Sequence, residues 1–255
     1  MAAQEYASRT KALRLLLKKI RLAPGESELP GILLSMDRSD IDRPARVAFV
    51  NAHAFNLACG DDGFLANLLE SDFVFRDGSG MAILYRMLGR DPGLNLNGTD
   101  MIPRIIDLYA GHKAALFGTR EPYLGQAARA IKKTGLDPVI LMDGFQDDES
   151  YLECIRDRKV SLIILAMGMP KQERVAALLA GNLEYPCLIV CGGAILDFMG
   201  GKVTRAPFLF RRLGIEWVYR LAREPKRLFR RYIVGNFIFL LRSAFLALPI
   251  RLVSK

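Results

Sequence analysis

The stretches S-L-I-I-L-A (Ser161–Ala166) and C-L-I-V-C-G-G (Cys187–Gly193) decide the fold. Each is a continuous apolar run, and Lys171–Ala180 between them has helical spacing. Strands without polar alternation are typical of parallel sheets that are covered on both faces. The two stretches therefore predict consecutive strands of an α/β protein.

The same alternation extends back towards the N-terminus. We expect further strands at 46–51, 72–75, 113–117 and 139–142. Helical spacing separates them, over 54–69, 81–88, 99–110, 121–134 and 148–158. Thr99 or Asp100 is expected to cap the third of these helices. This order predicts a Rossmann-like fold, a mostly parallel sheet with helices on both faces.

Charge and composition divide the chain into three parts. Residues 1–45 combine a basic amphipathic helix with a loop that has at most a short strand around 32–36, and residues 46–201 form the α/β core. Residues 202–255 hold thirteen Lys or Arg and two acids, a net charge of +11, whereas the whole chain carries +9. A basic stretch that runs into apolar residues is suited to an anionic membrane surface, so we expect a basic helical membrane-binding appendage.

The apolar run 233–250 is interrupted by Asn236, Arg242 and Pro249. A spanning helix needs about 20 predominantly apolar residues, and a central Arg is costly there. We therefore expect a helix that lies at the interface or packs on protein rather than one that spans. The N-terminus has no signal-peptide pattern, and the four cysteines lack C-x-x-C spacing, which favours reduced core thiols in a cytosolic protein.

Ligands of open α/β sheets bind at the carboxyl ends of the strands. Polar or glycine residues stand at these ends: Asn51, His53, Asp77, Gly78, Gly118, Gln172, Gly193 and Asp197. Such glycines let backbone amides approach a phosphate closely. Neither G-x-G-x-x-G nor a Walker loop is present, so the usual dinucleotide and nucleotide fingerprints are not supported.

Taken singly, these residues leave the chemistry open. Asp77, in the turn D-G-S-G, is suited to be a general base, but it could equally be a turn or helix-capping Asp. His53 could be a hydrogen-bonded structural residue, and Gln172 opens a helix after Pro170. A nucleic-acid-binding protein and a non-catalytic membrane scaffold are alternatives to an enzyme, because basic tails commonly contact phosphate backbones.

A set of ordered motifs narrows the choice. They are N-A-H-A-F-N-L-A (51–58), R-D-G-S-G (76–80), N-G-T-D (97–100), G-M-P-K-Q-E (168–173), C-G-G-A-I-L-D-F (191–198), R-A-P (205–207) and G-I-E-W-V-Y-R-L-A-R-E-P-K-R-L-F-R-R-Y (214–232). Over about residues 45–232 the chain resembles the WecG/TagA/CpsF family of bacterial glycosyltransferases.

The resemblance implies an inverting transfer of a sugar, N-acetylmannosamine or another hexose or uronic acid, from a UDP-sugar. The acceptor would be a sugar on polyprenyl diphosphate at the cytoplasmic face of the plasma membrane, in cell-surface polysaccharide synthesis. The protein would be peripheral there, bound to the anionic surface and without nucleic acid. Its apolar helices are also compatible with a homo-oligomer.

The resemblance also implies roles for residues. Asp77 would be the base, with a substrate site formed by Asn51, His53, Gly78, Thr99, Asp100, Gly118, Gln172, Gly193, Asp197, Arg220, Arg227 and Arg230. Asn95 stands where many members carry Arg, so a cation must come from elsewhere or the donor must differ. No D-x-D motif follows a strand, so we expect a metal-independent reaction without a cofactor.

Overall fold

A computed structural model describes residues 2–253, with side chains for residues 8–210 and 212–248. Its sheet has six parallel strands in the order β2-β1-β6-β5-β3-β4. They are β1 Ala45–Val50, β2 Phe73–Arg76, β3 Lys113–Gly118, β4 Asp137–Asp143, β5 Leu162–Leu165 and β6 Leu188–Cys191. The two apolar stretches that decide the fold are neighbours, with Leu162 opposite Leu188 and Leu165 opposite Cys191. The predicted parallel α/β fold is confirmed.

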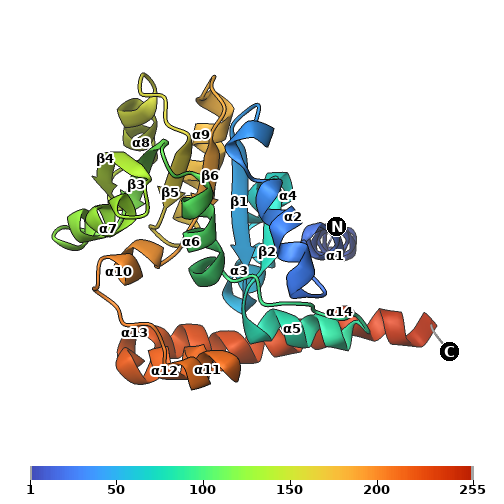
Figure 1. The fold of residues 1–255 in the computed structure, drawn as a ribbon. Coiled ribbons are helices and arrows are strands. Elements are labelled where there is room, and N and C mark those ends of the chain that lie inside the picture. Colours follow the sequence, from blue (N-terminus) through green and yellow to red (C-terminus); the bar gives the residue numbers. More distant parts are fainter. Residues whose placement is uncertain (1, 254–255) are drawn as a thin grey trace.

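Helices cover both faces of the sheet (Figure 1). One face is packed by α2 Leu29–Leu34, α6 Gly98–Leu108, α7 Tyr123–Lys132 and α10 Ile195–Met199. The other is packed by α1 Ala2–Lys19, α3 Ala52–Ala58, α4 Asp62–Glu70, α5 Gly78–Met87, α8 Asp148–Ile155 and α9 Lys171–Asn182. Side chains alternate along each strand, so neighbouring residues enter opposite layers: Phe49 lies in the first and Val50 in the second.

Three local predictions are wrong. The cap of α6 is Asn97, whose Oδ1 accepts from the Asp100 amide at 3.0 Å, so Thr99 and Asp100 fall inside the first turn. The helix expected over 54–69 is two helices, because Asp61 caps a new one at the Phe64 amide. The expected loop or strand near 32–36 is the helix α2, flanked by one-turn helices at Glu26–Glu28 and Arg38–Asp40.

The N-terminal helix belongs to the body of the protein. Leu13, Leu16 and Leu17 of α1 are buried in the same layer as α3 to α5. The Tyr85 hydroxyl donates to the Leu17 carbonyl at 2.6 Å. The apolar stripe of α1 therefore packs on protein, while Lys11 is exposed to solvent.

The residues after α10 form an arm of helices across the carboxyl ends of the strands (Figure 1). It consists of α11 Phe208–Arg212, α12 Glu216–Arg223, α13 Pro225–Phe229, a π-helical turn Arg230–Val234 and α14 Gly235–Val253. Residues 225–248 form one helix long and apolar enough, by length and composition, to cross a membrane.

One side of α14 is fixed to the α/β core. Phe239 is buried and packs edge-on against Phe55 of α3, with ring centroids 5.5 Å apart. Arg242 donates to the Asn56 carbonyl at 2.8 Å, and the Asn56 amide donates to the Gly235 carbonyl at 2.7 Å. The interrupting Arg242 is thus used in docking α14 onto the protein, as the sequence pattern predicts for a protein-packed helix.

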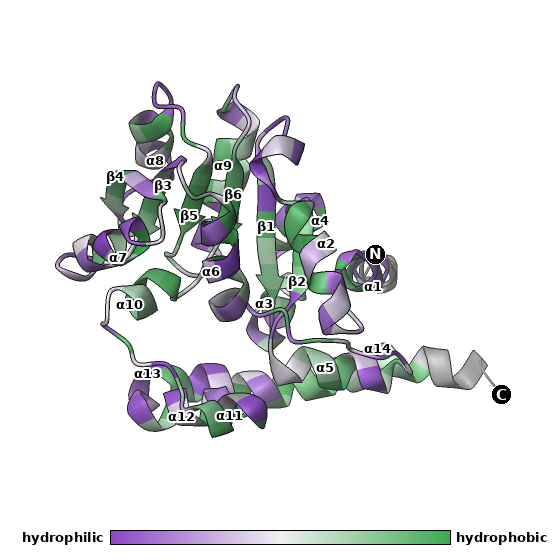
Figure 2. Cartoon of the chain, in the orientation of Figure 1, coloured by the Kyte–Doolittle hydropathy of each residue, from purple (hydrophilic) through white to green (hydrophobic). Residues whose placement is uncertain are grey.

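The arm also exposes large apolar side chains, and hydrophobic positions recur along it (Figure 2). They are Phe208, Leu209, Leu213, Phe229, Phe237, Leu240, Leu241, Phe245 and Leu248. Because monomeric soluble proteins rarely expose large contiguous apolar patches, this surface indicates contact with something apolar.

Candidate active site

Asp77 and Asn51 meet where β1 and β2 end. Asn51 caps α3, and its Oδ1 accepts from the amides of His53 and Ala54, both at 3.0 Å. With Oδ1 occupied, the amide nitrogen faces the other way and donates to Asp77 Oδ2 at 3.2 Å. Asp77 makes no side-chain capping bond to α5, although it occupies the capping position. The carboxylate is therefore held by Asn51 rather than used by its own helix.

Arg76 holds the turn that carries Asp77 in place through hydrogen bonds. This buried guanidinium donates to the carbonyls of Pro92 at 2.9 Å, Gly93 at 3.0 Å and Gly78 at 2.9 Å. The Gly78 amide in turn donates to Asn95 Oδ1 at 2.7 Å, and Gly78 has a φ of +82°. Asn95 thus has a local role, which is to hold the turn beside the carboxylate.

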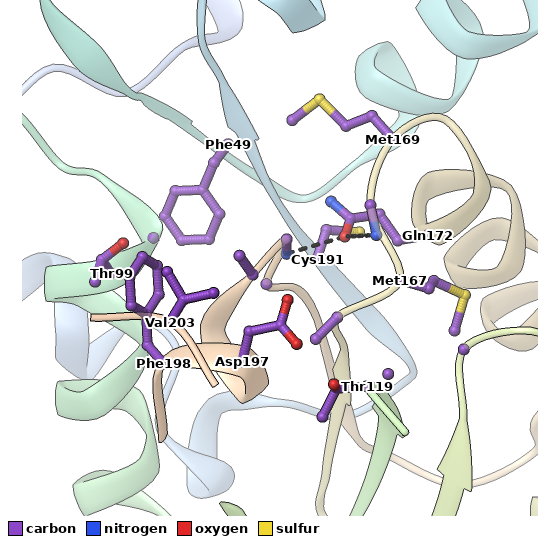
Figure 3. Close-up of a pocket in the computed structure, with 18 of the residues that line it drawn as sticks. Phe49, Thr99, Thr119, Met167, Met169, Gln172, Cys191, Asp197, Phe198 and Val203 are labelled. Atoms are coloured by element: carbon purple, nitrogen blue, oxygen red, sulfur yellow. Dashed lines mark hydrogen bonds between the residues drawn. The ribbon is translucent and has the colours of Figure 1, made fainter. Parts of the chain in front are cut away.

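A polar cavity of about 370 Å³ opens at the carboxyl ends of the strands. Glycines after four strands line it, namely Gly118, Gly144, Gly168, Gly192 and Gly193. Figure 3 shows Asp197 in its centre, between Phe198 and Thr119, with Phe49 and Thr99 beyond Phe198. The close approach of these segments depends on glycine at Gly118, where a Cβ would lie 2.9 Å from the Ala166 carbonyl oxygen. The result is a cavity with backbone close to its interior, as a phosphorylated ligand requires.

Gln172 joins two of the glycine turns. Its Oε1 accepts from the amides of Gly168 at 3.2 Å and Gly193 at 3.0 Å (Figure 3). Its Nε2 donates to Glu173 Oε1 at 2.9 Å, and both side chains are buried. Burial raises the pKa of the Glu173 carboxyl to about 7, against the hydrogen bond from Gln172. Gln172 is therefore a clamp within the cavity wall, oriented by Glu173.

Three cations of the polar cavity already interact with other side chains. Lys202 Nζ lies 3.1 Å from Asp197 Oδ1 and 3.3 Å from the Thr119 hydroxyl. Arg227 forms a two-pronged ion pair with Glu224, at 2.5 and 2.9 Å. Arg220 also lines the cavity and lies over the Phe198 ring, 5.7 Å from its centroid.

A second cavity, of about 600 Å³, lies between α5 and the arm. Its wall is largely apolar, with Ile83, Trp217, Ile233, Phe239 and Leu240. Residues common to the two cavities mark their junction: Asn51, His53, Asp77, Thr99, Arg220 and Arg231. Asp77 thus stands between a polar, glycine-lined space and an apolar one.

The electrostatics of this junction favour a basic carboxylate beside a neutral imidazole. Burial raises the pKa of Asp77, while the hydrogen bond from Asn51 and the charges of Arg231 and Arg220 lower it. Burial and the Arg231 charge lower the pKa of His53 to about 4. A carboxylate with a raised pKa is the better proton acceptor, and an uncharged His53 can exchange hydrogen bonds with a ligand near neutral pH.

Most of the residues expected from the sequence meet here. Asn51, His53, Asp77, Thr99, Gly118, Gln172, Gly193, Asp197, Arg220 and Arg227 line the polar cavity, and Gly78 lines the apolar one. Two do not line either cavity. Asp100 accepts from Arg205 at 2.6 Å, which ties the R-A-P segment to α6, and Arg230 is exposed.

Sequence reasoning missed Arg76, Lys202 and Arg231, and it singled out Asn95 only as a departure from the family pattern. Arg76 adjoins the D-G turn, and Arg231 is one of two adjacent arginines in R-R-Y, but neither signal separates a buried guanidinium from an exposed one. Among the side chains described, no group of three or more His, Cys, Asp or Glu is placed to hold a metal ion. Metal independence stays a prediction.

A half-buried carboxylate, glycine-lined backbone and guanidinium groups at the carboxyl edge of a parallel sheet define the class: an α/β enzyme whose site is suited to a phosphorylated ligand. The chain belongs to the glycosyl transferase WecG/TagA/CpsF family, whose model matches residues 29–251. It is therefore a glycosyltransferase, as the ordered motifs predict.

Curated relatives carry a more specific name. A Bacillus spizizenii protein is 23% identical over 209 residues, covering 79% of this chain and 81% of its own. A protein of Staphylococcus aureus strain MW2 is 25% identical over 205 residues, covering 78% and 80%. Both are N-acetylglucosaminyldiphosphoundecaprenol N-acetyl-beta-D-mannosaminyltransferases.

Proposed function

We propose that this chain transfers a sugar from a UDP-sugar to a sugar carried on polyprenyl diphosphate, with inversion at the anomeric carbon. The observation that carries the proposal is the position of Asp77 at the junction of a polar, glycine-lined cavity and an apolar one. The reaction needs one basic group between a polar nucleotide sugar and a lipid-linked acceptor. The names of the relatives support the acceptor class, with N-acetylmannosamine as the first sugar to test.

The polar cavity suits the nucleotide sugar. The backbone around Gly118, Gly144 and Gly193 can approach a diphosphate closely, and Lys202 and Arg227 supply positive charge. These two cations line this cavity and not the apolar one. Donor binding would compete with the Lys202–Asp197 and Arg227–Glu224 pairs, so both pairs are expected to rearrange when UDP binds.

The apolar cavity suits the lipid-linked acceptor. Trp217, Ile233 and Leu240 offer apolar surface to the first isoprene units, and the cavity leads to Asp77. An acceptor lying with its lipid towards α14 would present its sugar at the junction. The two substrates would then meet beside Asp77, one from each cavity.

Asp77 would act as the general base. It takes the proton of the acceptor hydroxyl while that oxygen attacks the anomeric carbon of the donor sugar. The bond between that carbon and the diphosphate oxygen breaks, and UDP leaves with the electron pair. Asn51 would hold the carboxylate in place during this step, because its amide hydrogen bonds to Oδ2.

The protein would work as a peripheral enzyme at the cytoplasmic face of the plasma membrane. The arm carries exposed apolar side chains such as Phe245, which is 63% exposed, within a segment of net charge +11. Apolar insertion and attraction to anionic lipids reinforce each other. A bound acceptor would reach the apolar cavity from the same membrane, because α14 forms part of its wall.

A donor screen tests the proposal. Purified protein is incubated with UDP-N-acetylmannosamine and other UDP-sugars, and with a short-chain prenyl-diphosphate-N-acetylglucosamine acceptor. We expect glycosylated acceptor and free UDP in equal amounts with one donor. No transfer from any UDP-sugar, combined with tight binding of DNA or RNA at physiological salt, would overturn the proposal in favour of a nucleic-acid-binding protein.

A further inference from the structure

Arg231 is a half-buried cation that lies over the neighbouring Tyr232 ring, 5.7 Å from its centroid. It is the second residue of the π-helical segment Arg230–Val234, and it lines both cavities. Its Nε is buried and has no hydrogen-bond partner within the described part of the chain. A buried N–H donor without a partner costs free energy unless it meets an acceptor such as an anion. An anionic ligand would satisfy this donor.

Most neighbouring cations differ from Arg231 in their ion pairs or their exposure to solvent. Arg227 is paired with Glu224, and Lys202 with Asp197, whereas Arg230 is exposed to solvent. Arg220 resembles Arg231, since its Nε is also buried without a partner, and it lines both cavities too. Two arginines whose Nε atoms have no hydrogen-bond partner among the described residues thus stand at the junction.

The surroundings of Arg231 indicate which anion it would bind. The residues that follow it, Tyr232, Ile233, Asn236 and Phe237, line the apolar cavity and not the polar one. An anion held by Arg231 would therefore have Asp77 on one side and apolar surface on the other. A prenyl diphosphate that carries a sugar has this order of groups: lipid, two phosphates, then the saccharide.

We propose that Arg231 binds the diphosphate of the lipid-linked acceptor, and this assignment rests on the proposed function. Its planar group can give two parallel hydrogen bonds to phosphate oxygens. Arg220, which lines the same junction, would assist. The contact would place the acceptor sugar at Asp77 and would exclude acceptors that lack the diphosphate.

Binding of farnesyl diphosphate, a soluble prenyl diphosphate without sugar, tests the assignment. Calorimetry compares the wild-type chain, Arg231→Gln and Arg231→Lys, with Arg223→Gln as the matched control on an exposed arginine of the same arm. Arg231→Gln is expected to weaken binding about ten- to hundredfold, the range for hydrogen bonds to charged groups. Arg231→Lys should lie between, because Lys keeps the charge without the planar pair of donors.

Two further ligands, UDP and inorganic pyrophosphate, show which phosphate compound Arg231 binds. UDP should bind Arg231→Gln as it binds wild type, and inorganic pyrophosphate should bind more weakly than farnesyl diphosphate because it lacks the apolar tail. An unchanged affinity of Arg231→Gln for farnesyl diphosphate would overturn the assignment. An equal loss for UDP would also overturn it, since it would move Arg231 to the donor.

Thermal unfolding excludes a merely structural role. Because the Arg231 Nε makes no hydrogen bond within the described residues, the melting temperature of Arg231→Gln without ligand should be equal to that of wild type or higher. A structural arginine would give a lower one. The two proposals fail separately: if wild type transfers sugar while Arg231→Gln keeps its acceptor KM, the assignment of Arg231 fails alone. If wild type accepts no UDP-sugar, the proposed function fails.

Discussion

Glu173 gives the chain a pH-dependent stability that one substitution should remove. The residue is 2% exposed, and its Oε2 has no hydrogen-bond partner among the described residues. Burial raises the pKa from 4.5 to about 7. Between these values the folded state binds more protons than the unfolded state, so the free energy of unfolding falls as the pH rises.

The size of the effect follows from the shift. Each pKa unit corresponds to 1.36 kcal/mol, so a rise from 4.5 to about 7 costs about 3 kcal/mol of stability by pH 8. Below pH 4.5 the cost is absent, because both states are protonated. Glu173→Gln imitates the neutral form and still offers an oxygen to Gln172, so it should lack this dependence.

Urea unfolding of wild type and Glu173→Gln from pH 4.5 to 8, in the same detergent buffer, measures the difference directly. We expect the free energy of unfolding of the variant to exceed that of wild type by an amount that rises with pH and reaches about 3 kcal/mol at pH 8. Glu149→Gln, at an exposed carboxylate, controls for the loss of one negative charge. A difference between wild type and Glu173→Gln that is constant over the whole range would refute the reasoning.

Three other predictions concern the cavity wall, the arm and the absence of a metal. Gln172→Ala should leave the amides of Gly168 and Gly193 without their acceptor and raise the KM for the donor about tenfold, because a lost buried hydrogen-bond partner costs about 1–3 kcal/mol. Initial rates at varied UDP-sugar concentration measure this KM, and an unchanged value would argue against the clamp. The double variant Leu241→Ser, Phe245→Ser should co-sediment less with anionic vesicles, because each apolar side chain buried in the membrane contributes about 1.5–3 kcal/mol to binding. Equal binding by the variant and wild type would exclude this face of the arm as the membrane contact. Transfer should persist in excess chelator, and loss of turnover that manganese or magnesium restores would contradict metal independence.

The sheet was predictable because its strands are continuous apolar runs. Leu162–Leu165 and Leu188–Cys191 are buried on both faces, and such burial leaves a direct mark on the sequence. The strand ends follow from the strands, so Asp77 and Asn51 could be placed at one edge before the structure. Boundaries that depend on single caps, as at Asn97 and Asp61, were less predictable because several nearby residues can cap.

The connections within the site were not predictable, because they join residues distant in the chain. Arg76 contacts the carbonyls of Pro92 and Gly93, and nothing local marks these partners. Arg230 and Arg231 are adjacent and chemically identical. The π-helical turn that begins there helps to set which of them faces the cavities, and such a turn depends on how the arm packs.

The most direct test of the account is the rate of sugar transfer by Asp77→Asn. The substitution keeps the shape of the side chain and removes its ability to accept a proton. We predict that kcat falls by about 10²–10⁴, the usual contribution of a general base, while UDP binds as it does to wild type. An Asp77→Asn protein that folds normally and transfers sugar at the wild-type rate would contradict the claim that this carboxylate activates the acceptor.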